Sequence, residues 1–468
     1  MQLLKDDAGP NYYCFTRWAR VGLVGQFNLD QFNNLPMAKK AFEGKFKDKT
    51  KNNWADICAG QEFKTVAGKY TLIEIDYAAD DEPAAPTKKA RKGAAADDDD
   101  DDGAAGGGGG LTRANSSKLP PSVQKLVELI FDLKMMETQM TELEYDVKKQ
   151  PLGRLSKNTI KAGFQVLKDL EEVINGTSDG DVTELSNRFY TLVPHVFGMQ
   201  RPPAIKTLDQ VRKKLQMIEA LADIEVATSI SKSTKGAGSV IDANYEKLNC
   251  HITPVDRSSS EFHTIEEYVK NTFVGTKAPK IVDVFAIERD GEVKRFADKG
   301  AKIGNRKLLW HGSRLTNFAG ILSQGLRIAP PEAPVSGYRF GKGIYLASVA
   351  SLSANYCRTY GTANFCMLLA DAALGKPAEV MTDTYMEKPL PKTDSTLAVG
   401  TLQGSAPKPL ELRKPVLPSN KVTIDNKVDV PCGKPVSKTI SCSCYEEQFV
   451  VYDVAQVKLA YLIWFEQH

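Results

Sequence analysis

The middle of the chain carries apolar residues three and four positions apart over long stretches. Three such sets lie at 123–133, 160–170 and 208–221, and their members are Val123, Leu126, Val127, Ile130, Leu133, Ile160, Phe164, Leu167, Leu170, Leu208, Val211, Leu215, Ile218 and Leu221. This spacing places one apolar stripe on each helix. We therefore predict an all-α bundle of four to six helices over residues 119–235.

The first 79 residues show a different pattern, rich in aromatic and β-branched side chains. The run from Tyr12 to Val24 predicts a hairpin, and Pro36 to Phe46 predicts a helix with one apolar face. We predict a small β-rich domain with one helix over residues 1–79. Because the sequence starts inside an apolar run, we expect the first strand of this domain to be missing.

Short apolar or alternating runs, separated by glycine and proline turns, dominate residues 246–468. The clearest are Ile281 to Ile287, Leu308 to His311, Phe365 to Leu369 and Phe449 to Tyr452. They predict a mixed, strand-rich domain. The whole chain is therefore expected to be a multidomain α+β protein.

Two segments without apolar periodicity separate these domains. Residues 80–118 consist mainly of Ala, Pro, Gly, Lys and Asp, including six consecutive aspartates at 97–102. Such a segment cannot bury enough surface to offset its ordering entropy, so we predict a flexible linker. A shorter break lies at 231–238.

Composition excludes several classes of protein. The 468 residues are 42% apolar and 25% charged, which allows about three domains with buried cores. No stretch approaches the ~18 uninterrupted apolar residues of a membrane span, and no secretory signal is visible. The eight cysteines are scattered and form no C-x-x-C pair. We expect a soluble, intracellular protein with no disulfides, no metal site and no membrane contact.

Basic residues gather in two places although the net charge is only +3. The lysines between Lys39 and Lys51 either bind the phosphates of a nucleic acid or form an ordinary solvated helix face. The knot from Lys88 to Lys92 is similar to a nuclear import signal, and we expect the protein in the nucleus.

Three short motifs near the C-terminal end carry residues suited to chemistry. They are Trp310-His311-Gly312-Ser313, Gly341-Lys342-Gly343-Ile344-Tyr345 with the following Ser353-Ala354-Asn355-Tyr356, and Tyr445-Glu446-Glu447-Gln448-Phe449. Taken singly each is weak, because a lone histidine at a strand end is more often structural and the Gly-x-Gly lacks the helix of a dinucleotide fold. In combination they are specific.

The combination resembles the poly(ADP-ribose) polymerase family of ADP-ribosyltransferases, in its short, DNA-break-activated type. The run from Leu309 to Pro334 is the most specific part of the resemblance. The resemblance as a whole extends over nearly the entire chain. Arg17 to Gly22 is similar to the family's WGR domain, and Leu221 to Glu225 to its helical regulatory domain. The resemblance implies a helical domain that blocks the active site, and a mainly antiparallel β ADP-ribosyltransferase domain over 246–468.

The resemblance implies that NAD⁺ is the substrate, cleaved between nicotinamide and ribose. Positive charge then develops on the ribose, so a site must grip the carboxamide and place negative potential at the ribose. Gly312 and Ser353 would hold the carboxamide, Tyr345 and Tyr356 would flank the ring, and His311 would donate to a ribose hydroxyl. The residues implied to bind NAD⁺ are His311, Gly312, Ser313, Arg327, Tyr338, Tyr345, Ser353 and Tyr356. Arg327 and Tyr338 would lie near the adenine half.

The family's catalytic glutamate is where this sequence departs from the pattern. Aligning Phe449 to Asp453 with the family places Gln448 at that position and Glu447 one residue early. In a strand, a shift of one turns the side chain to the opposite face. Three hypotheses follow. In the first, Glu447 reaches the site through a β-bulge and acts as the catalytic glutamate. In the second, Gln448 takes that position in a weak or mono-ADP-ribosylating enzyme, and in the third an original glutamate has been replaced, which leaves the enzyme inactive.

The resemblance further implies binding of 5′-phosphorylated DNA breaks through backbone contacts, without base readout. The implied DNA-binding residues are Gln2, Trp18, Arg20, Lys49 and Lys51, with Ala19 in place of the signature glycine. Expected partners are histones or other chromatin proteins as acceptors, and an accessory factor that completes the site. The alternative is a DNA-end-binding scaffold whose transferase site is inactive.

Overall fold

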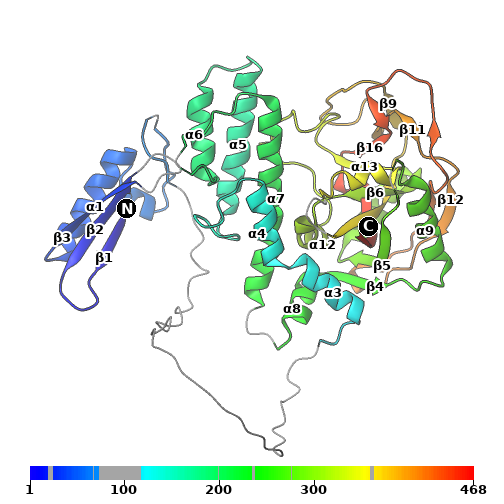
Figure 1. Cartoon of the computed structure of the whole chain (residues 1–468), viewed down its shortest axis with the longest axis horizontal. Helices are drawn as coiled ribbons and strands as arrows, with labels where there is room; N and C mark the ends of the chain where they lie inside the picture. The colour runs from blue at the N-terminus through cyan, green and yellow to red at the C-terminus, as the bar shows by residue number, and fades with distance from the viewer. Residues whose placement is uncertain are drawn as a thin grey trace, which may run out of the picture.

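The computed structural model describes residues 1–18, 25–66, 68–72, 117–198, 200–234, 238–275, 277–358 and 363–467. The described residues form three bodies in chain order: a small sheet with helices, a helical region and a large sheet domain (Figure 1). This confirms the predicted fold class. Most of the predicted linker at 80–118, together with Ala19 and Arg20, lies outside the described residues.

The first body is a three-stranded antiparallel sheet of β1 (Gln2–Lys5), β2 (Tyr12–Trp18) and β3 (Gln26–Phe32). Helix α1 (Leu35–Thr50) packs on one face of this sheet, and the short α2 (Trp54–Cys58) follows. Asn34 caps α1 through the Met37 N–H, and Pro36 occupies its first turn. The buried face of α1 carries Phe42 and Phe46, whose rings meet Trp54 edge-on.

Six helices lie between residues 121 and 247 of the described chain. They are α3 (Pro121–Ile130), α4 (Leu133–Glu142), α5 (Lys157–Ile174), α6 (Val182–Leu192), α7 (Leu208–Ser233) and α8 (Val240–Lys247). Each of the three predicted apolar sets lies on these helices, with its buried members facing one common core. A capping box at Thr207 and Gln210 fixes the start of α7. Helix α8 follows the predicted end of the helical domain at residue 235 and packs on α3 and α7.

The third body is built around an eleven-stranded sheet, mostly antiparallel, with the order β4-β5-β17-β8-β6-β7-β16-β10-β9 and β12-β13 attached to β6. The strands are β4 (Cys250–Pro254), β5 (Lys280–Arg289), β6 (Arg306–Gly312), β7 (Ile344–Ala347), β8 (Asn364–Ala373), β9 (Pro377–Val380), β10 (Ser395–Ala398), β12 (Lys408–Glu411), β13 (Lys427–Val430), β16 (Gln448–Val451) and β17 (Val457–Glu466). A smaller sheet joins β11 (Gly400–Gln403), β14 (Val436–Ser437) and β15 (Cys444–Glu446).

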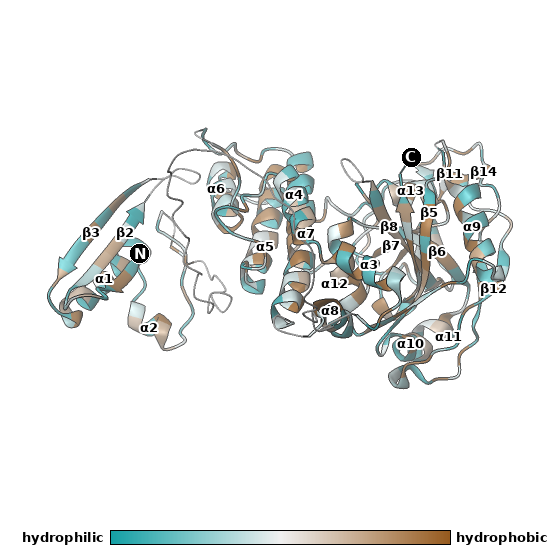
Figure 2. Ribbon diagram, turned by 60° about the horizontal axis from the view of Figure 1, so that its bottom comes forward, coloured by the Kyte–Doolittle hydropathy of each residue, from teal (hydrophilic) through white to brown (hydrophobic). Residues whose placement is uncertain are grey.

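The helices of the third body cover the sheet and its edges. They are α9 (Ser260–Thr272), α10 (Glu292–Arg295), α11 (Ala301–Ile303), α12 (Phe318–Gln324) and α13 (Ala350–Ala354). The central strands are strongly apolar, as expected for strands buried on both faces (Figure 2). One core runs from the helical region through α12 into the sheet, and a second lies beneath α9. The helical region and the sheet domain are thus packed together.

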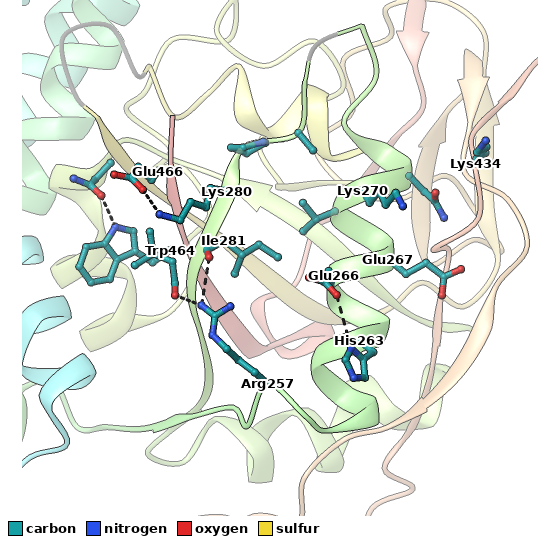
Figure 3. Close-up of a pocket in the computed structure, with 16 residues that line it drawn as sticks. Arg257, His263, Glu266, Glu267, Lys270, Lys280, Ile281, Lys434, Trp464 and Glu466 are labelled. Atoms are coloured by element: carbon teal, nitrogen blue, oxygen red, sulfur yellow. Dashed lines mark hydrogen bonds and ion pairs between the residues drawn. The ribbon is translucent and has the colours of Figure 1, made fainter. Parts of the chain in front are cut away.

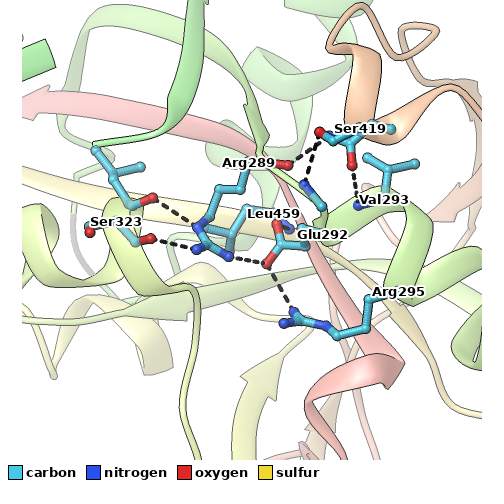
Figure 4. A network of polar contacts seen from close by, with 10 residues as sticks. Arg289, Glu292, Val293, Arg295, Ser323, Ser419 and Leu459 are labelled. Carbon is cyan, nitrogen blue, oxygen red and sulfur yellow. Dashed lines mark hydrogen bonds and ion pairs between the residues drawn. The ribbon is translucent and has the colours of Figure 1, made fainter. Parts of the chain in front are cut away.

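A buried ionic network holds α12 in place (Figure 4). The Arg289 guanidinium donates to the Leu322 carbonyl at 2.8 Å and the Ser323 carbonyl at 2.6 Å, and it pairs with Glu292 at 3.0 Å. Glu292 also accepts from the Leu459 N–H at 3.0 Å. A cation on the last carbonyls of a helix satisfies groups that have no partner within the helix. The network therefore fixes the point at which the chain leaves α12 for the candidate site.

Candidate active site

Strand β6 ends at the residues that the sequence predicts to contact the nicotinamide side of NAD⁺. Trp310 is fully buried against Tyr268 of α9, with ring centroids 4.8 Å apart, and this anchors the strand end. Nδ1 of the next residue, His311, lies 2.9 Å from the carbonyl oxygen of Tyr345. Because a carbonyl can only accept, Nδ1 carries the proton and Nε2 is the acceptor.

The protonation of His311 follows from its surroundings. Burial lowers the pKa of the imidazole, and the hydrogen bond to the Tyr345 carbonyl offsets this only in part. The ring is therefore neutral near pH 7. In this state Nε2 of His311 is a hydrogen-bond acceptor. The resemblance implies instead that His311 donates to a ribose hydroxyl, and that role stays a prediction.

A close approach of α13 to β6 shapes the predicted carboxamide site. A Cβ at Gly312 would lie 1.8 Å from the Ser353 carbonyl oxygen, so only glycine fits there. Ser353 itself is buried. The structure thus brings together the two residues predicted to hold the carboxamide. Ser313 lies beside them, but its hydroxyl accepts from the Asn317 amide at 3.0 Å and closes the turn into α12.

Two tyrosines lie beside these residues, since the Tyr356 N–H donates to the Ser353 carbonyl and the Tyr345 carbonyl contacts His311. The Tyr345 hydroxyl donates to the Gly341 carbonyl at 2.8 Å and accepts from the Phe340 N–H at 3.1 Å, so its ring is fixed. Burial raises the pKa of Tyr345, which keeps the phenol neutral. Tyr356, just beyond α13, keeps 55% of its surface exposed. Its ring is available for stacking with a flat ligand.

Gln448 and Glu447 point to different surroundings. In the β7–β16 pair Val450 lies opposite Tyr345, so Gln448, two residues from Val450, shares the face of Tyr345. Glu447 lies in the break between β15 and β16. Its buried carboxylate accepts from the Ser348 hydroxyl at 2.6 Å and the Gly404 N–H at 2.8 Å. Glu447 is therefore engaged in holding two loops, while Gln448 faces the site.

The predicted adenine-side residues are held by the helical region. Arg327 forms an ion pair with Asp223 of α7, and the Tyr338 hydroxyl donates to Oε1 of Glu219, also on α7, at 2.6 Å. The Glu171 carboxylate of α5 accepts from the backbone N–H groups of Val335 and Ser336. We call these contacts of Glu171, Glu219 and Asp223 with residues 327–338 the helical clamp.

The acidic groups of the helical clamp are deeply buried. Burial raises the pKa of Asp223 to about 7, although Arg327 lowers it, and burial also raises the pKa of Glu219. Sequence reasoning missed Glu171 and Glu219 as site residues. Glu171 has no signal in the sequence, and the only signal of Glu219 is its i, i+4 spacing from Asp223, which places two acids on one side of an amphipathic helix.

Comparison with known proteins agrees with this geometry. Residues 259–467 match the poly(ADP-ribose) polymerase catalytic domain, 117–245 the regulatory domain of the same polymerases, and 1–61 the WGR domain. Poly(ADP-ribose) polymerase 2 of Homo sapiens is 38% identical over 471 residues, 99% of this chain and 76% of that protein. The chain belongs to the poly(ADP-ribose) polymerase family.

Other members of the family extend beyond the region matched here. Poly(ADP-ribose) polymerase 1 of Gallus gallus is 40% identical over 99% of this chain but only 43% of its own length. Poly(ADP-ribose) polymerase 2 of Arabidopsis thaliana is 39% identical, with 69% of its length covered. The chain thus spans less than half of the polymerase 1 proteins it matches.

The predicted DNA-binding residues lie on the WGR domain. Trp18, at the end of β2, is 43% exposed, and Gln2 begins the neighbouring strand β1. Lys49 lies in the last turn of α1, and Lys51 ends this helix in the left-handed conformation, with φ of 63°. Arg20 lies outside the described residues. The four described residues come from three elements of one small domain.

A groove in the sheet domain lies away from these polymerase motifs (Figure 3). It has a volume of about 1350 Å³ and runs between α9 and the strand edge at Lys280 and Glu466. Lys280 pairs with Glu466 at 2.8 Å, and Arg257 donates to the Ile281 and Val282 carbonyls. In the described part of the chain, no three His, Cys, Asp or Glu side chains are grouped as metal ligands, and no helix is long and apolar enough to span a membrane.

Proposed function

We propose that this protein is an ADP-ribosyltransferase that uses NAD⁺, is activated by DNA strand breaks, and modifies itself and chromatin proteins in the nucleus during DNA repair signalling. The observation that carries the proposal is the convergence of His311, Gly312, Tyr345, Ser353 and Tyr356 around one site. The family membership and the chemistry of these groups support the same conclusion.

The site residues have distinct tasks in this reaction. Gly312 and Ser353 hold the carboxamide, while Tyr345 and Tyr356 flank the nicotinamide ring. His311 forms a hydrogen bond with a ribose hydroxyl and orients the sugar. The bond between C1′ of the ribose and the nicotinamide nitrogen breaks, and the electron pair leaves with nicotinamide. An acceptor oxygen then bonds to C1′ and gives up its proton.

The helical clamp accounts for control by DNA. Arg327 and Tyr338 cannot serve the adenine half of NAD⁺ while Asp223 and Glu219 hold them. DNA can open the clamp only by binding the open state more tightly than the closed state. The lysines at the end of α1 and the exposed Trp18 suit the end of a broken duplex.

A second function, DNA-end scaffolding without turnover, is favoured by one observation. Gln448 faces the site where the family has a catalytic glutamate, and an amide keeps the hydrogen bond but not the charge. A unit charge about 4 Å away is worth about 4 kcal/mol at an effective dielectric of about 20. A transferase with Gln448 alone would therefore be slower by orders of magnitude.

A single reaction separates the two functions. The purified chain is mixed with labelled NAD⁺, with and without a 5′-phosphorylated nicked duplex, and the products are resolved on a gel. Labelled protein that depends on DNA supports the transferase, and the length of the label distinguishes polymer from a single unit. DNA binding and NAD⁺ binding without nicotinamide release support the scaffold.

A further inference from the structure

Two carboxylates, those of Glu446 and Glu447, directly precede the uncharged Gln448 in the chain. Of these, Glu447 is already bound to Ser348 and Gly404. Glu446 is the last residue of β15 and is only partly exposed. In the described part of the chain, no ion pair joins its carboxylate to a cation, whereas Glu447 has its hydrogen-bond donors in place.

The chain geometry places Glu446 near the nicotinamide side of the site. The Gln448 amide reaches back to Sγ of Cys444 at 3.7 Å, although four residues separate them. A straight strand would hold side chains four residues apart by about 13 Å. The chain therefore bends at Glu446 and Glu447, and alternation within β15 puts Glu446 on the same side as Cys444.

The electrostatics of Tyr356 agree with this placement. Burial raises the pKa of Tyr356, Arg339 and Arg358 lower it, and Cys444 and Glu446 raise it again. The Glu446 charge is therefore felt at the phenol predicted to stack on nicotinamide. Burial also raises the pKa of Glu446 itself, while its backbone N–H lowers it. A partly desolvated carboxylate above its ordinary pKa is a suitable proton acceptor near neutral pH.

We propose that Glu446 is a catalytic residue that supplies part of the negative charge, and the proton-accepting group, that Gln448 lacks. This rests on the proposed transferase function. As C1′ loses nicotinamide, the Glu446 carboxylate stabilises the positive ribose. The acceptor hydroxyl then forms its bond to C1′, and its proton passes to the Glu446 carboxylate.

The test uses the full chain with NAD⁺ and a nicked duplex, and measures nicotinamide release together with protein-bound ADP-ribose. Glu446→Gln is expected to lower kcat at least tenfold with little change in KM, and to remove the acid limb of the kcat–pH profile. Glu411→Gln, an exposed glutamate of β12, is the matched control and keeps wild-type kinetics. In a Glu446→Gln/Gln448→Glu double variant, the new carboxylate restores turnover.

The outcomes separate this proposal from the one on which it rests. If the wild type releases nicotinamide and Glu446→Gln does so within twofold at every pH, the role of Glu446 is overturned and the transferase stands. If the wild type binds NAD⁺ and DNA but releases no nicotinamide, both the transferase and the role of Glu446 are overturned. If the double variant stays slow although circular dichroism shows it folded, charge at this site is not what limits the reaction, and the proposal fails.

Discussion

At residue 448 an amide stands on the site-facing side of β16, where the reaction favours a carboxylate. Gln448→Glu restores a charge on the face of Tyr345, and we expect kcat for nicotinamide release to rise at least tenfold. The reason is the roughly 4 kcal/mol that a nearby charge contributes at an effective dielectric of about 20. Steady-state kinetics with NAD⁺ check this, and an unchanged kcat would show that the charge is supplied fully elsewhere.

The close approach at Gly312 gives a second residue-scale prediction. A methyl group there would overlap the Ser353 carbonyl, and such overpacking costs about 1–3 kcal/mol. We expect Gly312→Ala to weaken NAD⁺ binding at least fivefold by calorimetry. Gly44→Ala on α1, where a Cβ meets open space, is the control and leaves binding unchanged. Equal binding by both variants would contradict the placement of the carboxamide site.

Most of the site residues could be predicted at this scale. His311, Tyr345 and Tyr356 lie in short motifs whose order along the chain is itself informative. The tautomer of His311 could not be predicted, because it depends on a carbonyl of another strand. The partners of Arg327 and Tyr338 were equally hidden, since Glu219 and Asp223 look like ordinary polar positions of an amphipathic helix.

At the scale of elements, the packing of α7 on residues 327–338 makes the closed state sensitive to pH. In the closed state burial raises the pKa of Asp223 to about 7. When α7 moves away, the carboxyl becomes solvated and its pKa returns toward its ordinary value of 3.8. Opening therefore releases a proton, and the closed state loses stability as the pH rises from about 4 to about 7.

The prediction from this linkage is a rise in basal activity with pH. The ratio of turnover without DNA to turnover with saturating nicked DNA is expected to increase from about pH 4 to about pH 7 and then level off. Taking the ratio cancels the pH dependence of the chemistry. Asp223→Asn, which cannot titrate, is expected to reduce the rise, and the rise that remains belongs to Glu219, whose pKa is also raised by burial. A flat curve for the wild type would contradict the linkage.

The long helices α3, α5 and α7 and the longest strands were predictable, because their apolar residues recur at helical spacing or form short apolar runs. The break at Glu447 was not. A residue between two strands of different sheets has no signature in the apolar pattern, and the choice between Glu447 and Gln448 depends on that break.

For the whole molecule, the proposed link between DNA binding and catalysis predicts that the two can be separated by mutation. Trp18→Ala is expected to weaken binding of a nicked duplex about tenfold, since an aromatic side chain on a nucleic acid contributes about 1–3 kcal/mol. Stimulation by DNA falls with it, while turnover without DNA stays the same. Phe27→Ala, an aromatic on β3 that is even more exposed than Trp18, is the control in fluorescence anisotropy and turnover assays. Equal losses in both variants would contradict a specific role for Trp18.

Removing the helical region tests the clamp at the same scale. Deleting residues 119–230 frees Arg327 and Tyr338, and we expect turnover without DNA to rise to the level that DNA induces in the full chain. Because one core joins this region to the sheet domain, the shortened chain must first be shown to be folded by its melting transition. A folded, shortened chain with no rise in basal turnover would refute autoinhibition.

The central claim is that this chain transfers ADP-ribose from NAD⁺ when it meets a DNA break. The most direct measurement is incorporation of labelled NAD⁺ by the purified chain, with and without a 5′-phosphorylated nicked duplex. We predict labelled protein that depends on the duplex, slower than expected for a site with a glutamate at 448. The absence of both label and free nicotinamide, with DNA and NAD⁺ bound, would contradict the claim.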